Sequence, residues 1–175
     1  MTWTPNVSPA NTDAFALREG VLAITAKAHT YAYCAQPLRG QVRGFQFRMK
    51  QGSDGGMSWG PGVCIRWANG TFLRVGLRSD GKCQIDLNGE QRLFGAHNPS
   101  RWIWVRARWL DHFGVVETSD DDEHFQERWR FEHDGKLLGL AESISAGKVP
   151  FSGNAIDNTD PGASGTCLVD RVVVY

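Results

Sequence analysis

The sequence predicts an all-β chain folded as a two-sheet antiparallel β-sandwich of the jelly-roll type, and three observations predict it. Several segments alternate apolar and polar residues with a period of two, the pattern of strands with one buried face. Tight-turn dipeptides such as Asn69-Gly70 and Asp80-Gly81 separate these segments. No convincing long helix interrupts them. About a dozen short strands with close turns are typical of a sandwich.

The most regular part of the chain is a meander near its middle. Asn69-Gly70 and Asp80-Gly81 are two-residue turn signals, and Asn88-Gly89 closes the last segment. Three alternating segments lie between them, at residues 63–67, 72–78 and 83–87. We therefore expect three consecutive antiparallel strands in one sheet.

The remaining segments continue in the same way. Residues 136–144 fit either a short helix or a strand, and Gly139 together with the β context favours the strand. Residues 147–165 are rich in Gly and Pro and are predicted to form a loop. We find no internal repeat and no linker, so we expect one domain over residues 1–175, either a whole protein or a module of a larger one. Further strands are predicted at residues 15–17, 21–25, 45–49, 102–109, 113–118, 128–131 and 167–175.

Composition excludes several classes of function. The 19 Lys and Arg balance the 19 Asp and Glu, whereas a nucleic-acid-binding protein normally carries a basic excess. No run of 18 apolar residues is present, so no membrane span is expected. The first residues show no signal-peptide pattern. We expect an extracellular or periplasmic location as part of a larger secreted protein, with a cytoplasmic location as the alternative.

The four cysteines are predicted to be mainly buried thiols. They form no Cys-x-x-Cys pair and have no histidine cluster beside them, which argues against zinc. Cys64 and Cys83 fall on the first and third strands of the meander, about 9–10 Å apart, too far for a disulfide. The pairing state of Cys34 and Cys167 is left open.

The order of these motifs resembles the concanavalin A-like lectin/glucanase superfamily, in particular its laminin G-like and glycosidase-appended members. The similarity extends over roughly residues 15–175 and implies a carbohydrate ligand or a glycosidase activity on this fold. Asp122 stands where these proteins usually have Gly, and Phe125 where they usually have Trp. The residues that carry the resemblance are Gly62–Trp67, Phe72–Leu77, Trp102–Arg108, Ser119-Asp120-Asp121 and Leu168–Val174.

Catalytic residues are not evident. Glycoside hydrolysis needs two carboxylates about 5–9 Å apart, one with a raised pKa. The closest run, Glu117–Glu123, lacks the spacing of the family's glucanases and straddles a strand end and a turn, so we interpret it as a solvated turn. The five histidines are scattered near turns and are predicted to lie at the surface. The lyase residues of this superfamily are also not evident, and an enzyme is disfavoured.

The polar side of the predicted strands carries candidate ligand-binding residues. In the strands between residues 62 and 109, one parity is apolar and predicts the core, while the other mixes arginine, amide, carboxylate and tryptophan side chains. Such a mixture suits a glycan, because aromatic rings stack on sugar C–H faces and guanidinium groups bind hydroxyls. A purely structural solvent face is the alternative. The candidate ligand-binding residues are Arg66, Arg74, Arg78, Gln84, Asp86, Trp104, Arg106 and Arg108.

Two loops add candidates. Trp59 lies in a loop too rich in glycine to bury it locally, so we expect a ligand contact there. Asp157, Asn158 and Asp160 could supply oxygen ligands to calcium, with a simple turn as the alternative. No other cofactor is expected.

The function expected from these observations is non-catalytic polysaccharide binding, in a module of a larger bacterial glycan-processing protein. Two alternatives stay open. One is a small glycoside hydrolase or polysaccharide lyase of the same fold, and the other is a structural or protein-interaction domain.

Overall fold

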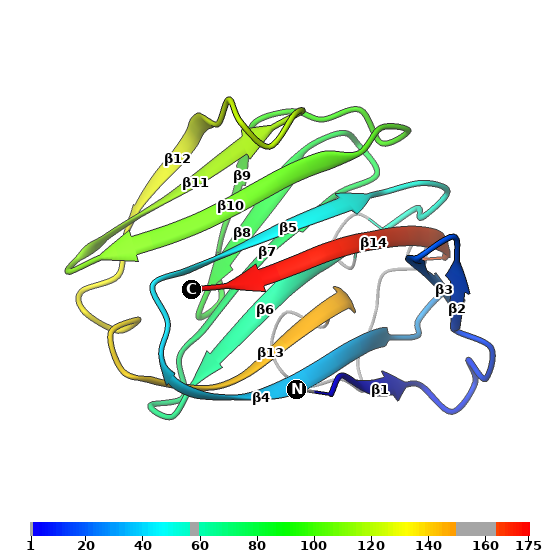
Figure 1. Ribbon diagram of the computed structural model, residues 1–175, viewed down its shortest axis with the longest axis horizontal. Coiled ribbons are helices and arrows are strands. Elements are labelled where there is room, and N and C mark those ends of the chain that lie inside the picture. The colour runs from blue at the N-terminus through cyan, green and yellow to red at the C-terminus, as the bar shows by residue number, and fades with distance from the viewer. Residues whose placement is uncertain (1, 57–59, 150–163) are drawn as a thin grey trace.

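Two antiparallel sheets packed face to face make up the computed structural model, which describes residues 2–56, 60–149 and 164–175 (Figure 1). This confirms the predicted sandwich. Sheet A contains, in spatial order, β1 (Thr4–Val7), β4 (Ala32–Gln41), β13 (Leu140–Lys148), β6 (Gly62–Trp67), β7 (Phe72–Leu77), β8 (Cys83–Leu87) and β9 (Glu90–Phe94). Sheet B contains β12 (Gln126–Glu132), β11 (Phe113–Ser119), β10 (Ile103–Leu110), β5 (Gly44–Lys50), β14 (Gly165–Val174), β3 (Val21–Ala26) and β2 (Phe15–Arg18).

The predicted meander is present as β6, β7 and β8, and it continues into β9. Asn88 and Gly89 join β8 to β9 with φ angles of 52° and 92°. Positive φ at both central residues is the mirror-image turn that matches the twist of a hairpin, and Asn-Gly adopts it readily. In the register, Ile65 lies opposite Leu73 and Val75 opposite Ile85.

Two other predictions can be compared with the strands. The segment after Gly139 is a strand, as favoured, but it begins at Leu140 and residues 136–139 form a turn. The C-terminal strand β14 pairs with β3 and β5, and β2 pairs with β3, so the two N-terminal strands lie beside the C-terminal one as expected. A tight turn at Asp111 joins β10 to β11.

The core between the sheets is built around aromatic rings. Trp67 of sheet A and Trp109 of sheet B meet edge to face, with ring centroids 5.6 Å apart. Phe45 lies 6.2 Å from Trp109, also edge to face. Trp109 Nε1 donates to the carbonyls of Val42 and Leu137, so its one polar atom is satisfied in the interior.

All four cysteines are buried and unpaired, which confirms the prediction of buried thiols. Burial raises the pKa of Cys64 to about 11 and that of Cys83 to about 12, so both stay protonated at neutral pH.

A buried ion pair holds one end of the sandwich. Lys148, the last residue of β13, pairs with Asp54, and both side chains are completely buried. Asp54 Oδ1 also accepts a 2.8 Å hydrogen bond from the backbone N of Gly56. The pair therefore fastens the 51–56 loop to sheet A. In the described part of the chain, no helix is long and apolar enough to cross a membrane.

Candidate functional site

The predicted ligand-binding residues divide between the two outer faces of the sandwich. Strands β6, β7 and β8 belong to sheet A, whereas β10 belongs to sheet B. Arg66, Arg74 and Asp86 therefore lie on one outer face, and Trp104 and Arg106 lie on the opposite one. The expectation of one shared polar face was wrong, because the chain crosses between the layers after β9.

On the outer side of sheet A, Arg74 is buried rather than open to solvent. Its Nε donates to the carbonyl of Val149 at 3.0 Å, and Nη2 donates to the carbonyl of Gly60 at 2.6 Å. Burial lowers the pKa of Arg74 to about 10, which still leaves the guanidinium charged at neutral pH. Arg74 thus bonds to the residues that lie just before β6 and just after β13.

The neighbouring polar residues of sheet A form a chain of hydrogen bonds. Arg78 donates to Gln84 at 3.2 Å, and Gln84 donates to Gln91 at 2.9 Å. Gln91 then donates to Asp86 at 3.0 Å, while Arg78 also forms an ion pair with Asp80. Gln84 and Asp86 are buried, so this network mainly ties β7, β8 and β9 together.

Arg66, like Arg78, is half-buried, whereas Arg74, Gln84 and Asp86 are buried. The Arg66 guanidinium lies 5.3 Å from the ring centroid of Phe72 on the neighbouring strand. Trp59 and the calcium candidates Asp157, Asn158 and Asp160 lie outside the described residues. Within the described ranges, no three His, Cys, Asp or Glu side chains gather in a way that could hold a metal ion.

The outer face of sheet B begins with a stacked cluster around Trp104. The guanidinium groups of Arg48 and Arg171 each lie 5.8 Å from the Trp104 ring, and Arg48 lies 4.9 Å from Trp102. Arg48 is fixed in turn by Asp170 at 2.8 Å. Because this packing leaves Trp104 only 8% exposed, its ring offers little surface to a ligand.

Next along this face, one carboxylate holds two arginines. Arg106 Nε donates to Glu117 Oε2 at 2.8 Å, and Arg108 donates to both oxygens of Glu117 at 2.9 and 3.0 Å. Burial raises the pKa of Glu117, but the two arginines outweigh it and leave the pKa below its usual value. Glu117 is therefore ionised at neutral pH. The other side of the Arg106 guanidinium lies 3.8 Å from the ring centroid of Phe125.

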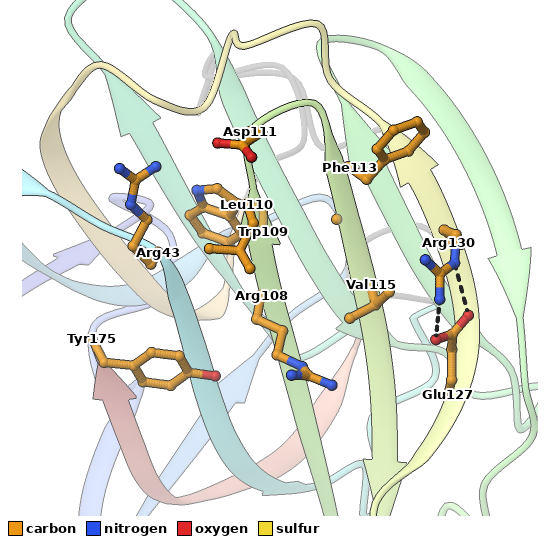
Figure 2. Close-up of a pocket in the computed structure, with 11 residues that line it drawn as sticks. Arg43, Arg108, Trp109, Leu110, Asp111, Phe113, Val115, Glu127, Arg130 and Tyr175 are labelled. Carbon is orange, nitrogen blue, oxygen red and sulfur yellow. Dashed lines mark hydrogen bonds and ion pairs between the residues drawn. The ribbon is translucent and has the colours of Figure 1, made fainter.

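Beyond Arg108 the surface opens into a groove of about 580 Å³ at the end of the β10–β11 hairpin (Figure 2). Tyr175 lies on one side of it, and its hydroxyl points toward Arg108. Glu127 and Arg130, joined by two hydrogen bonds, lie on the other side. The lining is completed by Arg43, whose side chain points away from the Tyr175 ring, and by residues of the β10–β11 hairpin: Leu110, Asp111, Phe113, Gly114 and Val115. We call this the sheet B groove.

Two aromatic rings of the groove are open to solvent. Tyr175 is 47% exposed and Phe113 is 52% exposed. Tyr175 packs on β5 where Gly44 has no side chain, since a Cβ there would lie only 2.5 Å from the Tyr175 ring. Burial of its other side raises the pKa of the Tyr175 hydroxyl, which stays protonated and can donate a hydrogen bond.

Sequence reasoning included Arg108 but missed the rest of the groove. A signal was present: once Ile103, Val105 and Ala107 are assigned to the core, parity places Leu110 on the outside. Phe113 then lies opposite Leu110 across the turn. An outward aliphatic and an outward aromatic side chain at a hairpin end indicate a binding surface.

The acidic run Glu117–Glu123 divides between strand and turn. Its first three residues end β11 and are buried, which corrects the expectation of a solvated turn there, while residues 120–123 form the turn as interpreted. Ser119 Oγ accepts from the backbone N of Asp121 and Asp122, and Asp121 Oδ1 accepts from the backbone N of Glu123 and His124. These bonds and the His124 side chain hold the pKa of Asp121 well below its usual value. Its side chain is thus committed to the turn.

Comparison with known proteins shows the fold. No protein-family model and no curated protein sequence matches the chain. Among solved structures, it is similar to SCLam, a non-specific endo-β-1,3(4)-glucanase of family GH16, with a TM-score of 0.63 and 13% identity over 96% of this chain and 75% of the other. The exoplasmic/lumenal domain of VIP36, bound to Ca²⁺ and Man3GlcNAc, gives a TM-score of 0.59 and 9% identity. The match covers 99% of this chain and 83% of that one.

A third similar structure is the GH43 protein BlXynB of Bacillus licheniformis. It gives a TM-score of 0.61 and 14% identity, and the match covers 93% of this chain but only 35% of that protein. These similarities show that the chain has the concanavalin A-like fold, which lectins and glycosidases share.

Proposed function

We propose that this protein is a non-catalytic carbohydrate-binding domain that docks a polysaccharide in the sheet B groove. The observation that carries the proposal is the pair of exposed rings that line this groove: Tyr175, whose hydroxyl points toward Arg108, and Phe113 at the end of the hairpin. Aromatic rings stack on the C–H faces of sugars, while guanidinium and hydroxyl groups bind sugar oxygens. Exposed aromatic side chains gathered at one place are typical of a binding site rather than of a solvent face.

The fold supports the proposal in a general way only. The GH16 protein is a glucanase and the VIP36 domain binds Man3GlcNAc, but one fold hosts many functions. The BlXynB match spans about a third of that protein, which is consistent with a module beside other domains. We accordingly propose that the chain works within a larger extracellular or periplasmic protein.

Glycan binding can be tested by affinity electrophoresis and calorimetry against a polysaccharide panel. We expect Tyr175→Ala and Phe113→Ala each to weaken binding about tenfold, because each removes one stacking ring. The matched control is Leu140→Ala, which removes a side chain that is equally open to solvent but lies on sheet A. Unchanged affinity in both ring variants would overturn the assignment to this groove.

Two further variants test the alternative face. Arg66→Ala removes a half-buried guanidinium of sheet A, and Trp59→Ala removes the loop tryptophan that the sequence singled out. If these two weaken binding and the groove variants do not, the glycan lies on sheet A instead.

One observation favours a hydrolase as the second candidate. Glu127 of β12 lies in register with Glu117 of β11, so two carboxylates occupy neighbouring strands beside the groove. Each is tied to arginine, and Glu117 is ionised, whereas glycoside hydrolysis needs a protonated acid. Release of reducing ends from a polysaccharide, lost in both Glu117→Gln and Glu127→Gln, would favour the hydrolase over the binding domain.

A further inference from the structure

We infer that the sheet B groove selects acidic polysaccharides, those whose sugars carry a carboxylate. This inference rests on the proposed carbohydrate binding in the same groove and adds the class of ligand. It follows from how the arginines around the groove are paired.

One edge of the Arg108 guanidinium is bonded to Glu117, and the other edge is available to a ligand. Arg108 Nε and Nη2 donate to Glu117, which fixes the plane of the guanidinium. In the described part of the chain its Nη1 donates no hydrogen bond, and the side chain is 55% exposed. The Nη1–Nη2 edge therefore presents two N–H donors to the groove, the arrangement that binds a carboxylate in a bidentate manner.

The local charge leaves room for one more anion. Glu117 is a single carboxylate shared by Arg106 and Arg108, whereas Arg130 has Glu127 to itself. At the end of the groove, the Arg43 guanidinium donates to the neutral amide of Gln41 at 3.3 Å, and among the described residues it forms no ion pair. Asp111 is the remaining acid of the lining, so the arginines outnumber the carboxylates. A ligand carboxylate would restore the balance without displacing an existing pair.

The position of Tyr175 relates this charge to a sugar ring. Its ring lies beside the groove with the hydroxyl directed at Arg108 (Figure 2). A hexuronate stacked on that ring can direct its C6 carboxylate along the same line, toward the Nη1–Nη2 edge. Ring stacking would then supply affinity for any sugar, and Arg108 would supply the preference for an acidic one.

The test compares polymers that differ only in charge. Polygalacturonate, alginate and glucuronoxylan would each be paired with its carboxyl-reduced form, and binding measured at low and high NaCl. We expect at least one acidic polymer to bind about tenfold more tightly than its reduced partner, because a charge-assisted hydrogen bond pair is lost on reduction. The advantage should shrink as salt screens the charges.

Arg108→Gln should remove this advantage, so that the acidic polymer binds no more tightly than its reduced form. Arg43→Gln, which breaks no ion pair, should reduce the advantage partly, so the inference can be tested even where Arg108→Gln unfolds. Arg101→Gln is the control, since Arg101 is exposed but lies before the opposite end of β10. If acidic and reduced polymers bind with equal affinity and Tyr175→Ala weakens both, the acidic preference is overturned while the proposed function stands. Absence of binding to every polymer would overturn the proposed function as well.

Discussion

Glu117 lies opposite Arg106 on the neighbouring strand, and Arg106 Nε donates a 2.8 Å hydrogen bond to Glu117 Oε2. Arg108 approaches the same carboxylate from the next outward position of β10. One buried acid therefore organises two arginines of sheet B, and this sets the charge beside the groove.

The first prediction concerns this carboxylate. Glu117→Gln should lower the free energy of unfolding by about 1–2 kcal/mol at pH 7, because the charge is lost from two ion pairs while solvent screens the half-exposed Arg108. Urea unfolding measures this loss. The difference between wild type and variant should vanish as the pH falls below the lowered pKa of Glu117, since the wild-type carboxyl is then protonated too. A difference that persists in acid would show that the role of Glu117 is not electrostatic.

The second prediction separates Trp104 from the groove. The guanidinium groups of Arg48 and Arg171 cover its ring, so Trp104→Ala should cost about 3 kcal/mol of stability through the cavity it leaves. Trp104→Phe keeps a ring in contact with the guanidinium groups and should cost less than half as much. Thermal or urea unfolding measures both. If Trp104→Ala is as stable as wild type but has lost glycan binding, Trp104 is a ligand-binding residue after all.

Parity along the strands predicted the core well, and the same property explains the error about the polar face. Val63, Ile65, Val75 and Ile85 alternate as predicted and are all buried. Alternation reports only whether a side chain points inward, however, and it is the same in both layers of a sandwich. The crossing between β9 and β10 carries no signal that separates it from another hairpin.

The burial of Arg74 could not be predicted for a different reason. Its partners are the backbone carbonyls of Gly60 and Val149, the second of which is 75 residues away in the chain. Backbone carbonyls have no sequence signature, so a buried arginine of this kind resembles a solvent-exposed one in any local pattern. His133 shows the same limit, because it was predicted at the surface and is in fact 1% exposed.

The third prediction concerns the buried pair of Lys148 and Asp54. Lys148→Met should destabilise the protein by about 3–5 kcal/mol, because the Asp54 carboxylate loses its cation while staying in the interior. The double variant Lys148→Met/Asp54→Asn should recover part of this loss, since an amide oxygen can still accept from Gly56 N without an unpaired charge. The free energies of unfolding of Lys148→Met, Asp54→Asn and the double variant complete a double-mutant cycle. Strictly additive losses would contradict a direct interaction.

The last prediction is a pH dependence that comes from His133. Its ring is buried 6.3 Å from Phe131, and burial lowers its pKa, with His112 acting in the same direction and Asp134 against it. The neutral ring is therefore favoured in the folded state, while the unfolded chain takes up a proton near pH 6.5. Stability should be full above that pH and fall as the pH is lowered through 6.5 toward the folded pKa. Burial also lowers the pKa of His97, which therefore contributes to the pH dependence with the same sign.

The free energy of unfolding in urea should fall less between pH 7.5 and 5.5 in His133→Leu than in wild type. The part of the fall that comes from His97 should remain. Equal slopes in the two proteins would mean that His133 binds its proton as readily when folded as when unfolded.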